Sequence, residues 1–251
     1  MLVALLSDFG LRDAYVGVMK AIIHARAPGV PIVDLSHDVP PGAVEVGALL
    51  LEEALPYLPV PSVVVGVVDP GVGSDRAPLA VRADGRYFVG PDNGLLSWAL
   101  GDEAQARCID PHLYLTPRSD TFHGRDVFAP AGAALARGVP FAEIGAALPS
   151  WERLPRPRPR RLADGALEAR VIRVDRFGNL ILDARAVDLP RSPRFLVAGR
   201  AIAGVHRAYF ERSDLIALIG SSGRVEIALP NGSAADALGV GRGTLVRVEA
   251  G

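Results

Sequence analysis

The stretch VVDPGVGSDR, residues 67–76, places an acid, a base and two glycines directly after a run of apolar residues. Asp69 supplies a carboxylate and Arg76 a guanidinium, while Gly71 and Gly73 allow the backbone to pass close to a ligand. The same pattern is ordinary turn chemistry if Arg76 lies on the surface. The stretch lacks the third glycine of a dinucleotide fingerprint and the GK[ST] of a phosphate-binding loop. The residue types therefore indicate a surface turn or a ligand-binding loop. They match neither the dinucleotide-binding motif nor the phosphate-binding loop.

Four further side chains have the chemistry of a site. Asp8 follows the apolar run LVALLS as Asp69 follows SVVVGVV, so both carboxylates are expected at the carboxyl ends of parallel strands, where α/β sheets bind ligands. A turn or helix-cap role competes for Asp8, and for Asp13 a helix cap is the favoured interpretation. His123 stands in TFHGRD just before a predicted helix, and His37 in DLSHDVP is its main competitor.

Several chemistries are disfavoured by what the chain lacks. Neither HExxH nor GxSxG occurs, so a zinc protease and a nucleophile-elbow hydrolase are unsupported. The single cysteine, Cys108, excludes an internal disulfide and a zinc–cysteine site. Asp8, Asp69 and His123 could in principle bind a divalent metal, but no closely spaced ligand pair supports one. We therefore expect no metal.

The length and the net charge of the chain limit the classes of protein to which it can belong. The 251 residues carry a net charge of -1 and are 49% hydrophobic, which suits one large or two modest domains with a substantial core. A near-neutral chain is not typical of nucleic-acid binding. The apolar run in MLVALLSDFG is far shorter than the ~20 residues needed to span a bilayer. We expect a cytoplasmic protein with a small-molecule substrate and no nucleic-acid or membrane partner.

Strand and helix signals alternate over residues 1–150. Continuous apolar runs predict strands, and apolar residues at helical spacing predict helices. The alternation favours an α/β domain whose mainly parallel sheet is covered on both faces. The predicted strands are 2–7, 30–36, 62–69, LAVRA and YFVG, and the predicted helices are 13–26, 43–58, 94–100 and 125–137.

The composition changes after this region. Residues 151–165 are rich in proline and arginine and predict a stiff linker, with a basic nucleic-acid patch as the less favoured interpretation. Residues 166–251 contain short apolar segments separated by turns, which predicts a smaller all-β, barrel-like domain. Its VDRFGN stretch is an ordinary hairpin turn in one interpretation; in the other it offers Asp175 for an ammonium group, Phe177 for stacking and Asn179 for an adenine edge.

The motifs SDFG, DLSHDVPPG, VVDPGVGSDR, FVGPDNGLL, TFHGRD, VDRFGN and NGSAA follow one another in this order along nearly the whole chain. They resemble the S-adenosyl-L-methionine hydrolases (adenosine-forming), which are relatives of the fluorinase and the chlorinase. The resemblance implies an α/β N-terminal domain, a barrel-like C-terminal domain and a homotrimer. It also implies active sites between the N-terminal domain of one subunit and the C-terminal domain of its neighbour.

The resemblance assigns roles to individual residues. Asp69, Arg76 and His123 match a catalytic triad that positions water or hydroxide for attack on the ribose 5′ carbon. The other matched positions bind substrate: Asp8 and Asn93 at the sugar, Asp13, Asp175 and Ser221 at the amino-acid end of methionine, Phe177 and Asn179 at the adenine, and Asn231 and Ser233 of the NGSAA motif.

The implied reaction is hydrolysis of S-adenosyl-L-methionine to adenosine and L-methionine without a cofactor. A halogenase is disfavoured, because the halogenases carry tyrosines where this chain has Asp69 and His123. In addition, the fixed negative charge of Asp69 repels a halide. The other alternative is a protein that binds or senses an adenosyl ligand without turnover.

Overall fold

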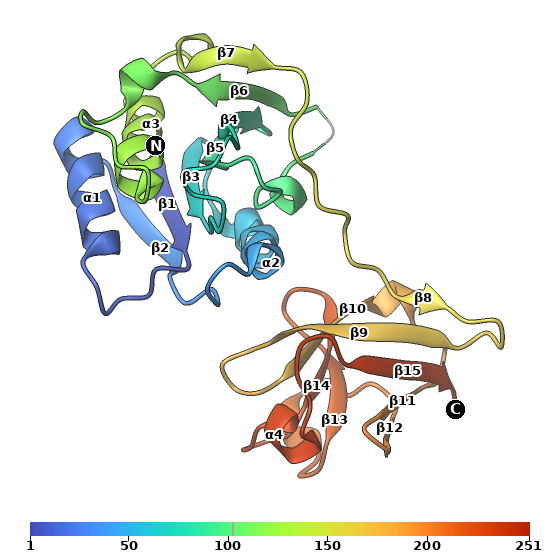
Figure 1. Ribbon diagram of the computed structural model, residues 1–251. Coiled ribbons are helices and arrows are strands. Elements are labelled where there is room, and N and C mark those ends of the chain that lie inside the picture. The colour runs from blue at the N-terminus through green and yellow to red at the C-terminus, as the bar shows by residue number, and fades with distance from the viewer. Residues whose placement is uncertain (102) are drawn as a thin grey trace. The chain divides into compact units, whose positions relative to one another are not determined.

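The chain divides into two compact units. The computed structural model describes residues 1–101 and 103–251. Unit 1 is Met1–Pro155 and unit 2 is Arg156–Gly251 (Figure 1). Unit 1 is an α/β structure and unit 2 is built on a single antiparallel sheet, so the predicted fold class is confirmed.

A seven-stranded sheet forms the centre of unit 1. Its strands are β1 (Leu2–Ser7), β2 (Ile32–Ser36), β3 (Ser62–Val67), β4 (Pro78–Ala83), β5 (Arg86–Pro91), β6 (Gln105–Ile109) and β7 (Gly145–Leu148). The strand order is β2-β1-β3-β5-β4-β6-β7. The pairs among β2, β1, β3 and β5 are parallel, and those formed by β4, β6 and β7 are antiparallel. Strands β6 and β7 were not predicted, because QARCI and GAAL contain no long apolar run.

Three helices cover the two faces of this sheet. Helices α1 (Tyr15–Arg26) and α3 (Ala129–Ala136) lie on one face, and α2 (Val44–Ala54) lies on the other (Figure 1). Helices α1 and α2 form the crossovers that the parallel strands β1, β2 and β3 require, whereas α3 lies between the antiparallel strands β6 and β7. Among the described residues, no helix has the length and apolar sequence needed to cross a membrane.

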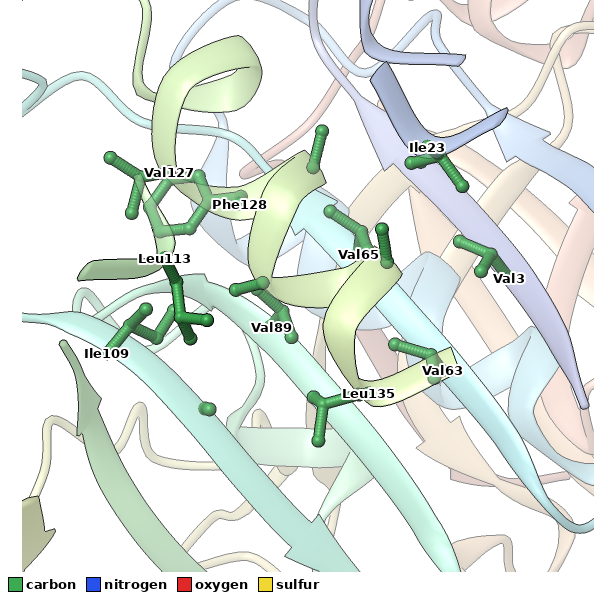
Figure 2. Packing of buried hydrophobic residues seen from close by; sticks show 14 of the residues in the cluster. Val3, Ile23, Val63, Val65, Val89, Ile109, Leu113, Val127, Phe128 and Leu135 are labelled. Atoms are coloured by element: carbon green, nitrogen blue, oxygen red, sulfur yellow. The ribbon is translucent and has the colours of Figure 1, made fainter. Parts of the chain in front are cut away.

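The alternation of side chains along the strands builds one core on each face. Val3 and Val65 pack in the cluster that includes residues of α1 and α3 (Figure 2). Their neighbours Ala4 and Val64 pack in the second cluster, with residues of α2. Successive side chains of a strand point to opposite faces, so continuous apolar runs are needed for a sheet buried on both sides. This is why LVALLS and SVVVGV could be recognised from sequence.

Asp13 does not cap the first helix. The predicted helix 13–26 begins at Tyr15, and Ala14 is its N-cap residue, without a side-chain hydrogen bond to the first turn. The helix-cap interpretation of Asp13 was therefore wrong. Helical spacing of apolar residues locates the body of a helix but does not fix its first residue.

Two other predicted helices are shorter than expected. The predicted helix 43–58 is an α-helix only to Ala54 and continues as a 3₁₀ turn, Leu55–Tyr57, because its proline cannot donate an α-helical hydrogen bond. The predicted helix at 94–100 is reduced to the 3₁₀ turn Ser97–Ala99.

The proline- and arginine-rich stretch 151–165 is divided between the units. The backbone of Leu154 bonds to unit 1, where its N–H donates to Ser97 Oγ at 2.9 Å and its carbonyl accepts from Trp98 Nε1 at 3.1 Å. Further along, β8 (Arg160–Arg161) pairs with the first long strand of unit 2. The first part of this stretch is thus anchored on unit 1 and its end joins the sheet of unit 2.

Unit 2 is a strongly curved antiparallel sheet. Its strands after β8 are β9 (Leu167–Val174), β10 (Leu180–Arg185), β11 (Pro193–Val197), β12 (Arg200–Ala203), β13 (Ile216–Ile219), β14 (Arg224–Ala228) and β15 (Leu245–Ala250), and its one α-helix among the described residues is α4 (Ala234–Leu238). The order is β12-β11-β15-β9-β10-β14-β13. A bridge between His206, which follows β12, and Leu218 of β13 brings the two ends of the sheet together. The sheet therefore nearly closes into a barrel.

We expect Gly90→Ala to destabilise unit 1. A Cβ at Gly90 of β5 would lie 2.5 Å from the carbonyl oxygen of Gly66 on β3, where the backbone has little freedom to move. The free energy of unfolding should fall by about 1–3 kcal/mol in urea titrations. The matched control is Gly241→Ala, where nothing lies within 4 Å of the added Cβ; its unfolding free energy should change by less than about 0.5 kcal/mol. Equal stability of the two variants would contradict this account of the packing.

Candidate active site

Two carboxylates emerge at the same edge of the unit 1 sheet. β1 and β3 pair in parallel with Ser7 opposite Val67, so Asp8 and Asp69 follow neighbouring strand ends. Both line a cavity of about 340 Å³. The other residues lining the cavity are Phe9, Tyr15, Val67, Val72, Thr121, Phe122, His123 and Gly124. The sequence predicted this meeting of strand ends correctly, because parallel strands present their carboxyl ends at one edge.

Arg76 joins Asp69 and His123. Its Nε donates to Asp69 Oδ1 at 3.0 Å, and its Nη2 donates to Asp69 Oδ2, which makes the pair bidentate. The same Nη2 lies 2.8 Å from His123 Nδ1. The guanidinium also lies over the ring of Phe128, 5.3 Å from its centroid. A planar guanidinium with several N–H groups can hold both partners at once in a fixed orientation.

The contact with Arg76 sets the tautomer of His123. Arginine can only donate, so Nδ1 accepts and the proton of the neutral ring is on Nε2. The side chain is buried, and Nε2 makes no hydrogen bond to any described residue. Burial, followed by the positive charges of Arg76 and Arg118, lowers the pKa of His123 below its ordinary value of 6.5. His123 is therefore a neutral imidazole at pH 7, and its Nε2–H is a buried donor with no partner among the described residues.

The turn that carries Asp69 and Arg76 packs against the segment that leads to His123. Gly73 has φ +82°, a left-handed conformation that favours glycine. A Cβ at this position would lie 2.6 Å from the carbonyl oxygen of Asp120. The second glycine of VVDPGVGSDR is thus required by the turn and by the close approach of two backbones.

Asp126 holds the segment before His123 from the other side. Its carboxylate accepts from the Ser119 N–H at 2.8 Å and from Arg125 Nε at 2.6 Å, and its carbonyl accepts from the Leu115 N–H. Burial raises the pKa of Asp126, but the hydrogen bonds from Arg125 and Ser119 outweigh burial and lower it.

Asp126 lies in a π-helical turn, Gly124–Phe128, that precedes α3. The predicted helix 125–137 is therefore α-helical only from Ala129.

A second pocket lies in unit 2, at the turn predicted to contact adenine. This pocket has a volume of about 550 Å³, and Phe177 and Asn179 line it. Asp175 shapes the turn, because its carboxylate accepts from the backbone N–H groups of Phe177 and Asn179 and from the Asn179 side chain. The other lining residues are Tyr209, Phe210, Leu229, Pro230, Asn231 and Gly232.

Two family models match this chain. The model of the SAM hydroxide adenosyltransferase N-terminal domain matches residues 3–145, and that of the C-terminal domain of the same family matches residues 169–247. The chain belongs to the SAM hydroxide adenosyltransferase family. The resemblance inferred from the ordered motifs is therefore confirmed.

Relatives cover nearly the whole chain. An "(R)-S-adenosyl-L-methionine hydrolase" from Thermus thermophilus is 44% identical over 97% of this chain and 97% of its own. A "Fluorinase" from Actinoplanes sp. is 27% identical over 76% of this chain and 74% of its own. The crystal structure of an uncharacterized conserved protein from Thermotoga maritima superposes with a TM-score of 0.88 at 31% identity, covering 98% of this chain and 99% of that chain. The family's hydrolases thus resemble this chain more closely than the fluorinase does.

The predicted site residues fall into two groups. Asp8, Asp69, Arg76 and His123 gather at the cavity of unit 1, whereas Phe177, Asn179 and Asn231 line the pocket of unit 2. The other predicted residues lie outside the linings of both cavities: Asp13 and Ser221 are exposed, Asn93 bonds to the carbonyl of Val68 and the N–H of Leu95, Asp175 holds its own turn, and Ser233 caps α4.

Of the aromatic residues in the two pockets, sequence reasoning found only Phe177 and missed the others. Phe9, Tyr15 and Phe122 form a cluster in unit 1, with ring centroids 5.1–5.8 Å apart. In unit 2, the pocket is lined by Tyr209, which is 45% exposed, and by Phe210, which is 89% exposed. The signal that could have found the second pair is two adjacent aromatics within the polar stretch HRAYFERSD. The Tyr209 hydroxyl donates to Glu226 at 3.0 Å; burial and this bond raise the pKa of Tyr209 to about 12.

Asp69 and His123 at the cavity of unit 1 are both bonded to a positively charged group. Among the described residues, no group of three or more His, Cys, Asp or Glu side chains is arranged to hold an ion. Asp69 instead directs both oxygens to Arg76, and His123 directs Nδ1 to the same guanidinium. A cation at this cavity would therefore have to compete with the guanidinium of Arg76 for Asp69 and His123.

We expect His123 to titrate below pH 6.5 in the folded protein, and Arg76→Gln to raise its pKa. Removing the adjacent positive charge makes the imidazolium form less unfavourable. NMR of ring-labelled histidine across pH 4–8 measures both values. The control is Arg12→Gln, a change of an exposed residue outside the cavity lining, which should leave the His123 titration unchanged. A wild-type pKa above 6.5 for His123 would contradict the assigned burial and charge.

Proposed function

We propose that this protein hydrolyses (R)-S-adenosyl-L-methionine to adenosine and L-methionine. The observation that carries the proposal is the arrangement of Asp69 and His123 around Arg76 at the cavity, in a family whose curated relatives bear this hydrolase name. The stereochemical descriptor comes from those relatives. The triad is suited to holding one small oxygen nucleophile, which is what hydrolysis at a carbon atom requires.

The three side chains divide the work on the nucleophile. The His123 Nε2–H donates to the attacking oxygen and fixes its position. Asp69 keeps lone pairs beyond those bonded to Arg76, and they accept a proton of the same water molecule. A carboxylate is far too weak a base to deprotonate water, whose pKa is about 15.7, in advance. Asp69 therefore takes the proton late, as the developing carbon–oxygen bond makes the oxygen acidic.

The leaving group needs no acid. The bond from water oxygen to the ribose 5′ carbon forms while the bond from that carbon to sulfur breaks. The electron pair leaves with sulfur, so the sulfonium becomes the neutral thioether of methionine. Because the substrate is already an activated electrophile, we propose that no metal or cofactor takes part. Alignment of oxygen, carbon and sulfur in a confined cavity then supplies the main acceleration, about 7 kcal/mol or more.

We propose that unit 1 binds the sugar and the reacting centre and that unit 2 binds the adenine. The carboxylate of Asp8, at the cavity of unit 1, accepts hydrogen bonds from the ribose hydroxyls. In the pocket of unit 2, Phe177 stacks on the adenine ring and Asn179 forms hydrogen bonds with the edge of the adenine. As the resemblance implies, the complete site combines unit 1 of one protomer with unit 2 of its neighbour in a homotrimer. A cytoplasmic location stays a prediction of the sequence.

We expect Asp69→Asn and His123→Ala to lower kcat for adenosine formation by about 10²–10⁴-fold, the usual contribution of a positioned acid or base. The dissociation constant of the substrate, measured by calorimetry, should change by less than about fivefold, since these groups contact the water rather than the adenosyl group. Asp75→Asn changes an exposed acid of the same turn and should keep wild-type activity. Wild-type kcat in both triad variants would overturn the mechanism.

We expect the new oxygen atom of adenosine to come from solvent. Mass spectrometry of the products formed in H₂¹⁸O should show one heavy oxygen in adenosine and none in methionine, because the carbon–sulfur bond breaks on the ribose side. A 5′-halo-adenosine in buffers containing chloride or fluoride would instead indicate a halogenase. Unchanged substrate would indicate a binding protein without turnover.

We expect the (R)-sulfonium epimer to be consumed at least about tenfold faster than the (S)-epimer at equal concentration. The two epimers place the methyl group and the methionine arm in exchanged positions, so only one of them keeps the sulfur in line with the held oxygen. Separate progress curves with each purified epimer measure the ratio. Equal rates would show that the cavity does not distinguish the configuration at sulfur.

A further inference from the structure

The histidine of DLSHDVP belongs to a chain of polar side chains behind the cavity. His37 is 5% exposed, and its Nδ1 lies 2.7 Å from Ser7 Oγ. Its Nε2 lies 3.2 Å from Asp34 Oδ1, and Asp34 Oδ2 accepts from Lys20 Nζ at 2.5 Å. The chain runs from Lys20, whose side chain is 33% exposed, to Ser7, which is fully buried.

This serine, histidine and aspartate do not form a nucleophilic site. Ser7 is 0% exposed, and neither Ser7 nor His37 lines the cavity. The Ser7 hydroxyl oxygen also accepts weakly from the Phe9 N–H, at 3.3 Å. A substrate carbon has no access to this oxygen, so the network acts on the backbone around it.

His37 contacts the chain on both sides of Asp8. Its ring bonds to Ser7, the residue before Asp8, and its carbonyl accepts from the Gly10 N–H at 2.8 Å. The same loop supplies a third contact, because the Gly42 N–H donates to Asp8 Oδ2 at 2.8 Å. The loop that follows β2 thus bonds to the side chain of Ser7, to the backbone N–H of Gly10 and to the carboxylate of Asp8.

Asp34 and Lys20 fix the orientation of the imidazole. Burial raises the pKa of Asp34, but the hydrogen bonds and charges of Lys20 and His37 outweigh burial and lower it. Asp34 is therefore ionised at neutral pH and attracts the Nε2–H of His37, which leaves Nδ1 to accept the Ser7 hydroxyl proton. In this network only Ser7 and His37 are buried, and their bond joins the end of β1 to the loop after β2. The Nε2 of His37 lies near Asp34 Oδ1 at 3.2 Å but without hydrogen-bond geometry, so the Ser7 bond is the one that specifies the arrangement of these segments.

We propose that His37 is a positioning residue for substrate binding: through Ser7 and Gly10 it fixes Asp8 in the orientation that accepts the ribose hydroxyls. This proposal rests on the proposed function, because it assigns Asp8 to the ribose. Holding a binding carboxylate in place before the ligand arrives saves the cost of ordering it on binding. His37 therefore contributes to the affinity for the substrate and not to the rate of the chemical step.

We expect His37→Ala to raise KM for the substrate and the dissociation constant for adenosine by about tenfold, with kcat changed less than about threefold. His37→Asn should restore most of the affinity, because the asparagine amide can occupy the place of Nδ1 and bond to Ser7. The control is His24→Ala, an exposed histidine on α1, which should behave as wild type. Calorimetry with adenosine, the unreactive product, separates binding from turnover.

A ligand without ribose hydroxyls provides the decisive comparison. For 2′,3′-dideoxyadenosine, wild type and His37→Ala should bind with equal affinity, since Asp8 has nothing to accept. In an Asp8→Asn background, His37→Ala should have no further effect on adenosine binding. A merely structural role for His37 would weaken both nucleosides alike, and that result would overturn the proposal.

The outcomes distinguish this proposal from the proposed function. If the wild-type protein binds neither adenosine nor the sulfonium substrate, the proposed function fails and the role of His37 fails with it. If the wild type binds and hydrolyses the substrate while His37→Ala keeps full affinity for adenosine, only the role of His37 fails. Should His37→Ala not fold, Ser7→Ala and Asp34→Asn must show a smaller loss in the same direction, again only for the nucleoside with hydroxyls. Unchanged affinity in both would overturn the proposal.

Discussion

The sharing of one guanidinium between Asp69 and His123 is the interaction on which the candidate site depends. Arg76 Nη2 donates to the carboxylate and contacts His123 Nδ1 at 2.8 Å. This geometry aligns the acid, fixes the histidine tautomer and leaves Nε2–H directed to no other described residue. The positive charge of Arg76 also disfavours a second one on the imidazole, so the histidine stays a neutral donor. In the proposed mechanism, the orientation of Asp69 and His123 therefore matters more than how strongly these side chains bind protons.

The architecture of unit 1 places polar side chains from separate segments at one edge of its sheet. Parallel pairing of β1 with β3 places Asp8 beside Asp69, and both backbones are fixed by strands buried on both faces. Loops then complete the cavity, and each loop is held by contacts outside it. Gly73 admits the backbone of Asp120, and Asp126 holds the segment before the histidine. Rigid strands and over-determined loops suit a reaction in which three atoms must lie in line.

The proposed mechanism accounts for the small number of acidic groups that line the cavity of unit 1. A sulfonium leaves as a neutral thioether, so the reaction needs no acid on the leaving side and one carboxylate is enough on the attacking side. A carboxylate placed beside the positive sulfur would stabilise the substrate more than the charge-dispersed transition state. The aromatic rings of Phe9, Tyr15 and Phe122 that line the rest of this cavity add no fixed charge.

The sequence by itself determined the fold class, the strand ends at which Asp8 and Asp69 lie, and the family, because apolar periodicity, residue order and motif identity are local properties. The family resemblance grouped Arg76 with Asp69 and His123, but it did not give the hydrogen bonds that join them. Nor did the sequence determine that Tyr209 and Phe210 line a pocket or that Asp13 lies outside both cavities. Those facts depend on which distant segments pack together. The partner of a long side chain is chosen by the surroundings that tertiary packing creates, and no spacing along the chain records it.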